Sequence, residues 1–448
     1  MFDSMLPKKG WLCGHPFFLL TLFALSCSQA PPPVPMAAIP STPACGAPAL
    51  AATSRLTFTE APSGLPRSGQ WRDDFDLADM NGDGELDLVH GPSRKGHPWP
   101  AIFLGNGKGT FILWKTAHYP PLPYDYGDAK AADFNRDGLM DLALSAHLRG
   151  LTVLLQEGDG HFAPYGSGLT MRLPAGDQSP NLTSRAIATP DWNRDGLPDL
   201  LALNEGPTRL GPTPPQDSLA LYLNRGGEWH RVAEAGPDGV FGTSLATGDA
   251  NGDGHADAII GTNVGGAGAL LQLGNGGGMI SRDLASLPAN ATVSAVAMSD
   301  LDRDRRDEIL SATIFLENEN ACIALDVIRL DDEKDTASRI FGERSRDVIV
   351  SLISADLDGD GRTDLLAVRK SGAMLPFLAT ETGHTREPVV PAPEAMVGCD
   401  AYGAHVADLD HDASPEVIVS YAGDLTAGPN LPCRSGGGFV LWRITTRP

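Results

Sequence analysis

The feature that most constrains the fold of this chain is a nine-residue acidic motif that occurs seven times. The copies read, in order, DMNGDGELD from Asp79, DFNRDGLMD from Asp133, DWNRDGLPD from Asp191, DANGDGHAD from Asp249, DLDRDRRDE from Asp300, DLDGDGRTD from Asp356 and DLDHDASPE from Asp408. Successive copies begin 54, 58, 58, 51, 56 and 52 residues apart. Because such a period is typical of solenoids, propellers and other arrays, the chain is predicted to be one repeat architecture.

Oxygen-bearing side chains alternate with other residues inside each motif, which we number from its first Asp. Positions 1, 3 and 5 are Asp or Asn in every copy, position 9 is Asp or Glu, and position 6 is Gly in five copies. Hard cations such as Ca²⁺ are bound by six to eight oxygens, some of them backbone carbonyls. A metal-free turn is the simpler interpretation of one copy. Seven copies in register instead favour a calcium loop.

The predicted calcium ligands are positions 1, 3, 5, 7 and 9 of every motif, with position 7 expected to supply its carbonyl. They are Asp79, Asn81, Asp83, Glu85, Asp87, Asp133, Asn135, Asp137, Leu139, Asp141, Asp191, Asn193, Asp195, Leu197, Asp199, Asp249, Asn251, Asp253, His255, Asp257, Asp300, Asp302, Asp304, Arg306, Glu308, Asp356, Asp358, Asp360, Arg362, Asp364, Asp408, Asp410, Asp412, Ser414 and Glu416. Up to seven Ca²⁺ ions would offset much of the formal net charge of -22.

Short apolar runs on both sides of each motif predict β-strands, whereas an EF-hand would need flanking helices and Glu at position 12. Further hairpins with Gly-rich turns are expected at 101–111, 152–162, 219–229 and 269–279. Each repeat therefore reads as four antiparallel strands, which predicts an all-β, seven-bladed propeller. The last repeat offers three strands, so we expect residues 55–61 to supply its fourth and close the ring.

The motifs and hairpins resemble FG-GAP/VCBS repeats, the family that includes the propeller of integrin α subunits, over residues 55–448. The Phe-Gly and Gly-Ala-Pro signatures are poorly kept, so the chain is closer to the bacterial VCBS-like branch. The resemblance implies Ca²⁺ in the blade loops. Motif five departs from the pattern with Arg305 at position 6, and motif seven departs with Ala413. Both also carry Glu at position 9, and we expect these two sites to bind more weakly.

The N-terminus has the pattern of an export signal. Residues 1–27 place two lysines before an apolar run, as in a secretory signal peptide. The run ends at ALSC, which resembles a bacterial lipobox and predicts lipidation of Cys27, with cleavage near Ala30 as the alternative. Residues 28–54 are rich in Pro and Ala and are predicted to form an extended tether. The protein is thus expected at the outer membrane or cell surface through that lipid, or otherwise secreted or periplasmic.

Four cysteines follow Cys27, and none has the spacing of a zinc site or a CxxC redox motif. Disulfides are permitted in an exported protein. Cys399 and Cys433 both fall in the last repeat and are predicted to form one. Cys45 and Cys322 would pair only if the tether folded back onto the propeller, which we do not expect.

No catalytic motif accompanies the repeats: HExxH, GxSxG and Walker sequences are absent. The acidic charge argues against nucleic acid as a partner. The favoured hypothesis is a monomeric, non-enzymatic scaffold that binds a protein or a glycan. The alternative is a polysaccharide lyase or another carbohydrate-active enzyme, which would need a basic residue and an aromatic platform in one central groove. Trp71, Trp99, Trp114, Trp192, Trp229 and Trp442 are candidates for that platform.

Overall fold

The computed structural model describes residues 45–46, 51, 54–94, 98–169, 184–204, 219–232, 241–264, 268–287, 291–331, 334–423 and 433–447. Residues 43–448 form one compact unit. The predicted signal peptide with Cys27, and most of the predicted tether, lie outside the described residues. No helix in the described part of the chain has the length and apolarity needed to cross a membrane.

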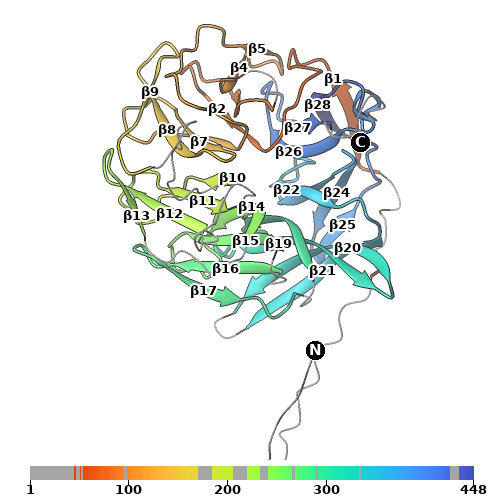
Figure 1. The fold of residues 1–448 in the computed structure, drawn as a ribbon. Coiled ribbons are helices and arrows are strands. Elements are labelled where there is room, and N and C mark those ends of the chain that lie inside the picture. Colours follow the sequence, from red (N-terminus) through yellow and green to blue (C-terminus); the bar gives the residue numbers. More distant parts are fainter. Residues whose placement is uncertain are drawn as a thin grey trace, which may run out of the picture. The chain divides into compact units, whose positions relative to one another are not determined.

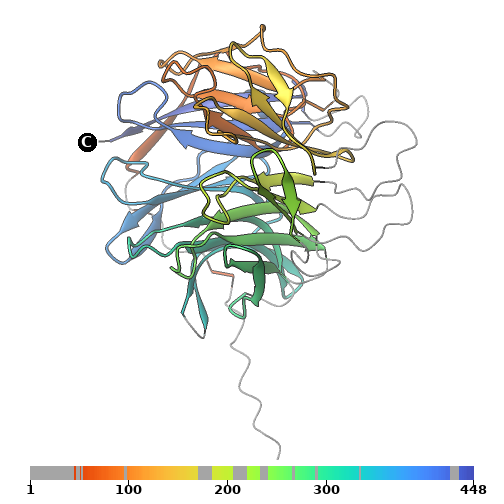
Figure 2. The same cartoon turned by 90° about the vertical axis from the view of Figure 1, so that its left-hand side faces the viewer.

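Seven sheets of four antiparallel strands surround a central axis (Figure 1), so the predicted seven-bladed propeller is confirmed. Figure 2 shows the same blades from the side, after a turn of 90°. The innermost strands, which line the axis, are β2 (Phe75–Ala78), β6 (Ala129–Ala132), β10 (Ser184–Ala188), β14 (Phe241–Gly248), β18 (Thr292–Ser299), β22 (Ile349–Ala355) and β26 (Asp400–Ala407). The second strands are β3 (Asp87–His90), β7 (Asp141–Ala146), β11 (Leu200–Asn204), β15 (Asp257–Val264), β19 (Glu308–Glu317), β23 (Asp364–Arg369) and β27 (Glu416–Ala422).

Two further strands complete each blade, and we number blades one to seven in the order of their innermost strands. The third strands are β4 (Ala101–Gly105), β8 (Gly150–Gln156), β12 (Leu219–Asn224), β16 (Ala269–Gly274), β20 (Asn320–Leu330), β24 (Met374–Thr380) and β28 (Gly437–Thr446). The outermost strands are β5 (Phe111–Leu113), β9 (Phe162–Pro164), β13 (Trp229–Arg231), β17 (Met279–Asp283), β21 (Asp335–Arg344), β25 (Gly383–Arg386) and β1 (Leu56–Ala61). The described chain adds one short 3-10 helix, η1 (Glu394–Met396).

Blade seven combines the two ends of the chain. Strand β1 pairs antiparallel with β28 in a continuous register from Leu56 opposite Thr446 to Ala61 opposite Leu441. The sheet order β1-β28-β27-β26 makes the N-terminal strand the outer edge of a blade whose other strands are C-terminal. Unfolding of this blade therefore requires that the N-terminal strand β1 separates from the C-terminal strand β28.

The core lies between the blades. Buried apolar side chains form one cluster at each of the seven blade interfaces, for example the Trp192 cluster between blades three and four. The second and third strands are buried on both faces, because each blade packs against a neighbour on either side. This explains their continuous apolar sequences, which lack the alternation of a sheet with one wet face.

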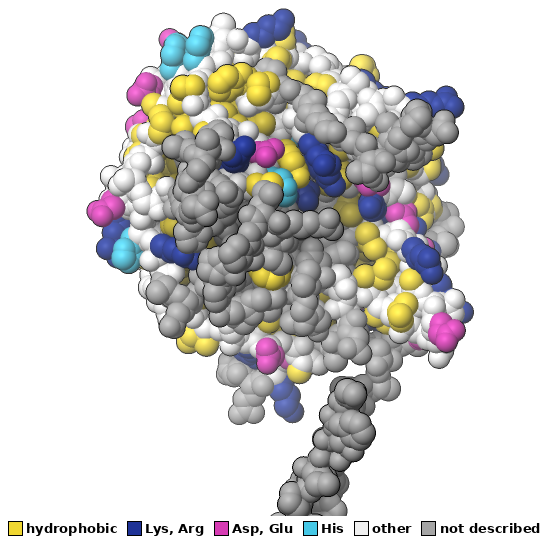
Figure 3. Space-filling view, in the orientation of Figure 1, with side chains coloured by type: hydrophobic (Ala, Val, Ile, Leu, Met, Phe, Trp, Pro, Cys, Tyr) yellow, Lys and Arg dark blue, Asp and Glu magenta, His cyan; other side chains and the backbone are white. Residues whose placement is uncertain are grey.

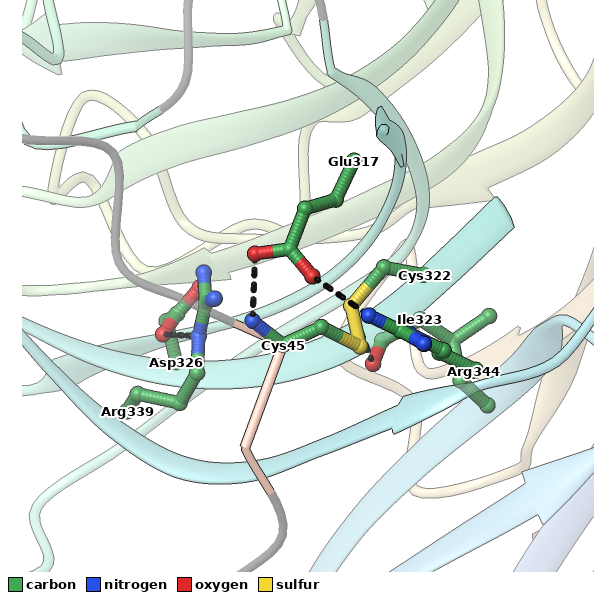
Figure 4. The surroundings of a disulfide bond; sticks show 7 residues. All are labelled: Cys45, Glu317, Cys322, Ile323, Asp326, Arg339 and Arg344. Atoms are coloured by element: carbon green, nitrogen blue, oxygen red, sulfur yellow. Dashed lines mark hydrogen bonds and ion pairs between the residues drawn. A yellow bond between two sulfur atoms is a disulfide. The ribbon is translucent and has the colours of Figure 1, made fainter. Parts of the chain in front are cut away.

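Two disulfides join the four cysteines of the described residues. Cys399 and Cys433 are joined with an S–S distance of 2.05 Å, within blade seven. Cys45 is bonded to Cys322, which corrects the expectation that these two cysteines would not pair (Figure 4). The Cys45 amide also donates to the Glu317 carboxylate at 3.1 Å. Composition predicted the stiffness of residues 28–54 but carries no information about distant contacts, and disulfide connectivity cannot be deduced from sequence.

Described residues between Cys45 and β1 bind to the end of blade six. The Ala51 amide donates to the Arg386 carbonyl at 3.0 Å. The Arg55 amide donates to the buried carboxylate of Glu387 at 2.7 Å. The described residues of the predicted tether are thus fixed to the ring at several points.

Candidate metal sites and the central cavity

All seven motifs connect the innermost strand of a blade to its second strand, as the sequence predicts. The same hydrogen bonds shape each loop. The carboxylate at position 1 accepts the amide of position 6 at 2.7–3.1 Å. The carboxylate at position 5 accepts the amide of position 7 at 2.8–2.9 Å. Backbone amides therefore hold both carboxylates in place on the inner side of the turn.

The carboxylate at position 9 begins the second strand and is buried in every motif. One of its oxygens accepts the amide of position 2 at 2.8–3.0 Å. In the five motifs with Asp, the other oxygen accepts an amide at the end of the third strand at 2.7–2.9 Å. Position 9 thus links the loop to the sheet.

Burial dominates the titration of these position 9 groups. Burial, with a smaller contribution from the neighbouring loop carboxylates, raises the pKa of Asp87, Asp199, Asp257 and Asp364 to about 6, against the lowering effect of the backbone amides that bind them. The pKa of Asp141 rises to about 7 for the same reasons. Each loop therefore concentrates negative charge around a buried acid, an arrangement that a cation would relieve.

Position 2 is a structural residue that the sequence argument missed. It is Met80, Phe134, Trp192, Ala250, Leu301, Leu357 or Leu409, and each packs in or against an interblade cluster. Its side chain anchors the loop between two blades while its amide binds position 9. The signal was available, because position 2 is apolar in all seven copies.

Position 3 divides the motifs into two kinds. In motifs one to four it is Asn, whose Nδ2 donates to the position 5 carboxylate at 2.8–2.9 Å. In motifs five to seven it is Asp, and an arginine from elsewhere in the chain forms an ion pair with it. The pairs are Arg329 with Asp302 at 3.3 Å, Arg55 with Asp358 at 2.6 Å and Arg443 with Asp410 at 2.9 Å.

The arginines of motifs five and seven also serve position 9. Arg329 lies 3.0 Å from Glu308, and Arg443 lies 3.7 Å from Glu416. Both come from the third strand of their blade. Where position 9 is Glu, a guanidinium takes the place of the strand amide that binds Asp in the other motifs. The two motifs with Glu at position 9 therefore also differ from the others in the third strand, which carries the arginine.

The donor set fits a hard cation. Oxygens of Asp300, Asp302 and Asp304 lie within 4.8 Å of one another, and so do those of Asp356, Asp358 and Asp360. Motif seven brings together Asp408, Asp410 and Glu416 in the same way. One oxygen of Asp410, Oδ1, is buried without a hydrogen-bond partner. Clustered carboxylate oxygens are the kind of ligand that Ca²⁺ takes in proteins.

Backbone conformation separates the motifs further. Positions 4 and 6 have positive φ in all seven copies. Motifs one, four and six place Gly at both positions, whereas motif five has Arg303 (φ 67°) and Arg305 (φ 72°). Motif seven has His411 (φ 59°) and Ala413 (φ 68°). The requirement at position 6 was recognised from sequence, but the one at position 4 was missed because Arg occupies it in three copies.

A cavity of about 610 Å³ lies at the axis of the ring. Residues 72–74, just before β2, and the innermost strands of blades two to seven line it. Charged side chains come from blades one, two, three and seven, with Lys370 added from blade six. Strands β14, β18 and β22 contribute Ser, Thr, Ala and aliphatic side chains. The cavity therefore has one charged wall and one wall of small and apolar residues.

Four groups of the charged wall form a connected cluster. Asp74 accepts from Lys130 at 2.9 Å and lies 3.1 Å from His405 Nε2, and Lys130 lies 3.5 Å from Asp128. Burial raises the pKa of Asp128 to about 7, and the charge of Asp74 adds to the shift. Burial also opposes ionisation of Asp74, but Lys130 and His405 hold its pKa well below the usual range.

We expect His405 to make the stability of the propeller depend on pH. Burial acts to lower its pKa, yet contact with the Asp74 carboxylate raises it above the ordinary value, against the opposing charge of Lys130. A raised pKa gives stabilisation that is complete below about pH 6.5 and is lost as the pH rises through the folded-state value. The free energy of unfolding of wild type should therefore exceed that of His405→Gln at pH 5.5 and approach it at pH 8.5. A difference between the two proteins that is constant with pH would contradict this assignment.

Two further charged residues of the cavity have unusual surroundings. Asp73 is 5% exposed and has φ of 79°, a conformation that costs a residue other than Gly about 1–3 kcal/mol. Its Oδ1 binds the Arg185 guanidinium, while Oδ2 is buried without a hydrogen-bond partner. Arg72 lies over the Tyr402 ring at 5.3 Å, and its Nε is likewise buried and unpartnered.

The tryptophans do not form a platform in this cavity. Trp71, Trp192, Trp229 and Trp442 are buried in interblade clusters. Trp99 and Trp114 line a separate outer groove of about 320 Å³ with Tyr119 and His118. The aromatic residue that does line the central cavity is Tyr402, which sequence reasoning did not single out.

Comparisons with known proteins support the assignment of the sequence repeats. The model of the FG-GAP-like repeat matches residues 191–260 and 356–419, which contain motifs three, four, six and seven. Human integrin alpha-7 is 35% identical over 95 residues, or 19% of this chain and 8% of the integrin. The chain therefore spans a small fraction of that relative's length. These matches confirm the resemblance to FG-GAP-like repeats.

Two solved structures are similar to this chain at low sequence identity. BBS1N, crystallised in complex with ARL6DN, is 10% identical and superposes with a TM-score of 0.51 over 86% of this chain and 96% of its own. A lectin from Agrocybe aegerita that recognises non-reducing terminal N-acetylglucosamine is 17% identical, with a TM-score of 0.44 over 71% of this chain and 79% of the lectin. The first likeness shows the fold alone.

Proposed function

We propose that this chain, a propeller built from FG-GAP-like repeats, is an exported binding scaffold without catalytic activity whose blades are held together by calcium. The observation that carries the proposal is the shared loop geometry. In all seven motifs the same backbone amides orient the carboxylates at positions 1, 5 and 9. Seven metal-stabilised loops would keep the ring rigid, so that it can support a binding surface. The side chains of the ring would then determine which partner binds.

When bound, Ca²⁺ would supply positive charge that neutralises the loop carboxylates. The side chains at positions 1, 3 and 5 and the carbonyl at position 7 would hold the ion in each motif. Position 9 would orient the loop through two backbone amides where it is Asp, and through one amide and an arginine in motifs five and seven. It would contribute an oxygen to the ion where the turn allows it. The loop joins the first two strands of a blade. A bound ion would therefore restrain the ends of these two strands.

Calorimetric titration of the full chain with CaCl₂, after chelation, tests the metal part of the proposal. We expect up to seven ions per chain. The variant Asp83→Ala, which removes the position 5 carboxylate of motif one, should lower the count by one, whereas Asp347→Ala, outside the motifs, should leave it unchanged. A chain that takes up no calcium, or a count that Asp83→Ala does not alter, would reject the loop assignment.

We expect motif five to bind calcium most weakly, with motif seven between it and the others. Two non-Gly residues at positive φ cost each of these loops roughly 1 kcal/mol or more per residue. Arg303, Arg305 and Arg306 also add positive charge to motif five. Crystallography after partial depletion should show vacancies there first, and Arg305→Gly should raise its occupancy. Full occupancy in motif five beside vacancies in motifs one to four would contradict this order.

Export and a lipid anchor at Cys27 complete the proposal, and we expect the protein to be a monomer. Mass spectrometry of the mature N-terminus distinguishes a lipidated Cys27 from cleavage near Ala30. With Cys27→Ser, the lipid and the membrane association should both be lost.

A carbohydrate-active enzyme is the second candidate, favoured by one observation. Lys130, Arg72, Arg185 and Tyr402 meet in the central cavity, which supplies the basic and aromatic groups that such an enzyme requires. A screen of polysaccharides for new reducing ends separates the two candidates. A scaffold leaves every substrate intact, whereas an enzyme cleaves at least one and loses that activity in Lys130→Met.

A further inference from the structure

We infer that the central cavity is a binding site for a neutral, polyhydroxylated ligand, the terminal sugar residues of a glycan. The inference deepens the proposed scaffold function, on which it rests, by naming the ligand class and the place. Basic, acidic and histidine side chains gather near the middle of the face shown in Figure 3. The volume of about 610 Å³ falls within the range of small-ligand sites.

Carboxylates and cationic side chains line the cavity side by side, together with His405, which argues against an ionic ligand. Four carboxylates line it, and four cationic side chains lie among them. The carboxylates are Asp73, Asp74, Asp128 and Asp400, and the cations are Arg72, Lys130, Arg185 and Lys370. An anionic ligand would approach buried carboxylates, and a cationic ligand would approach buried guanidinium and ammonium groups. A neutral ligand meets neither penalty.

Residues that line this space carry unsatisfied polar atoms of both kinds. Asp73 Oδ2 is an acceptor and Arg72 Nε is a donor, and neither has a hydrogen-bond partner within the protein. Asp128 Oδ1 lies 3.5 Å from Lys130 Nζ but likewise makes no hydrogen bond. Buried polar groups normally have partners. A hydroxyl both donates and accepts, so vicinal hydroxyls on one sugar would satisfy the acceptor and the donor together.

The backbone holds the Asp73 carboxylate, with its unpartnered Oδ2, in position. This residue keeps a positive φ, although a residue other than Gly is strained there. Arg185 fixes one carboxylate oxygen and leaves the other without a partner. On the neighbouring strand β26, a Cβ at Gly403 would collide with Asp74 Oδ1, so only Gly permits this approach of two blades. Strain and close packing that fix a polar atom without satisfying it are typical of a binding site.

The opposite wall fits the other face of a sugar. A pyranose ring has apolar C–H faces as well as a rim of hydroxyls. Strands β14, β18 and β22 line the cavity with residues that include Ala246, Ala297 and Ile353, beside Ser351 and Ser354. Tyr402 adds an aromatic ring that Arg72 covers at 5.3 Å. The charged wall would bind hydroxyls while this wall contacts the ring, as in sites where a few polar groups set orientation within apolar surroundings.

The test is binding of the full, calcium-loaded chain to a printed glycan panel. The panel carries oligosaccharides ending in glucose, galactose, mannose or N-acetylglucosamine, beside oligosaccharides ending in uronic acid or sulfated sugars. We expect binding to at least one neutral terminus. Asp73→Asn and Arg72→Leu should each weaken it about 10- to 100-fold, because each removes a buried charged partner of a hydroxyl. Ser351→Trp should weaken it similarly by filling the cavity without removing a charge.

Matched controls separate the cavity from other surfaces. Asp347→Asn and Arg67→Leu make the same chemical changes outside the cavity and should leave binding unchanged, and melting curves identify any variant that fails to fold. Because Ser351→Trp leaves all the charged residues in place, it keeps the test valid if Asp73→Asn unfolds. Trp114→Ala probes the outer aromatic groove and should have no effect.

Three results would each overturn the inference. The first is binding to acidic termini only, and the second is binding that Trp114→Ala removes but the cavity variants do not. The third is the absence of binding to any neutral terminus. The first two results would leave the scaffold function intact. A chain that neither takes up calcium nor binds any partner would instead reject the proposed function itself, so the two failures are distinguishable.

Discussion

Chelation of calcium is expected to lower the melting temperature of this protein by about 10 °C or more. Each motif brings carboxylates together within 4.8 Å or around a buried position 9 acid, and they repel one another without a cation. A ligand at about 100 times its dissociation constant contributes about 2.7 kcal/mol per site. Several such sites act on one cooperative ring, and each 1 kcal/mol shifts the melting temperature by about 2–4 °C in a domain of 150–250 residues.

Differential scanning calorimetry with excess EGTA, and again after CaCl₂ is restored, measures this effect. A variant with Asp→Ala at position 5 of motifs one to four should start from a lower melting temperature and lose less on chelation. The changed residues would be Asp83, Asp137, Asp195 and Asp253. Identical melting curves with calcium and with EGTA would show that the loops are turns stabilised by their own hydrogen bonds.

Loss of the Cys45–Cys322 disulfide is expected to destabilise the propeller by about 5 kcal/mol. The two cysteines are 277 residues apart, so their bond removes much of the freedom of the unfolded chain. The Cys399–Cys433 bond spans 34 residues, and the same chain-entropy model gives about 3–4 kcal/mol. Between Cys45 and β1, the amides of Ala51 and Arg55 also donate to Arg386 and Glu387.

Denaturant titration of Cys45→Ala/Cys322→Ala against Cys399→Ala/Cys433→Ala compares the two bonds within one protein. The first pair should unfold at the lower denaturant concentration, and treatment with a reductant should bring wild type below both variants. Unfolding of Cys45→Ala/Cys322→Ala at the wild-type concentration would mean that β1 alone holds the N-terminal segment to the ring.

The architecture was predictable because each blade repeats the same local information. Seven motifs at a steady period, each followed by a hairpin signal, define seven sheets, and the continuous apolar strands agree with burial on both faces. The positions of the candidate metal ligands follow from that pattern as well. Because the motif occurs seven times, a chance similarity in one copy has little effect on the prediction.

Contacts between distant residues were not predictable in the same way. The pairing of Arg329 and Arg443 with positions 3 and 9 of motifs five and seven depends on the third strand, whose register is set by the whole blade. Each of these arginines occurs once, so no periodicity marks it. Asp73 precedes the first innermost strand and belongs to no motif, and its position in the cavity follows from closure of the ring.

The measurement that tests the central claim most directly is a crystal structure of the full chain grown with calcium. The account predicts an ion in the motifs, bound at 2.3–2.6 Å by oxygens of positions 1, 3 and 5 and by the carbonyl of position 7, with motif five the least occupied. Density for water alone in motifs one, four and six, whose glycines allow the turn without strain, would contradict the claim that these loops are calcium sites.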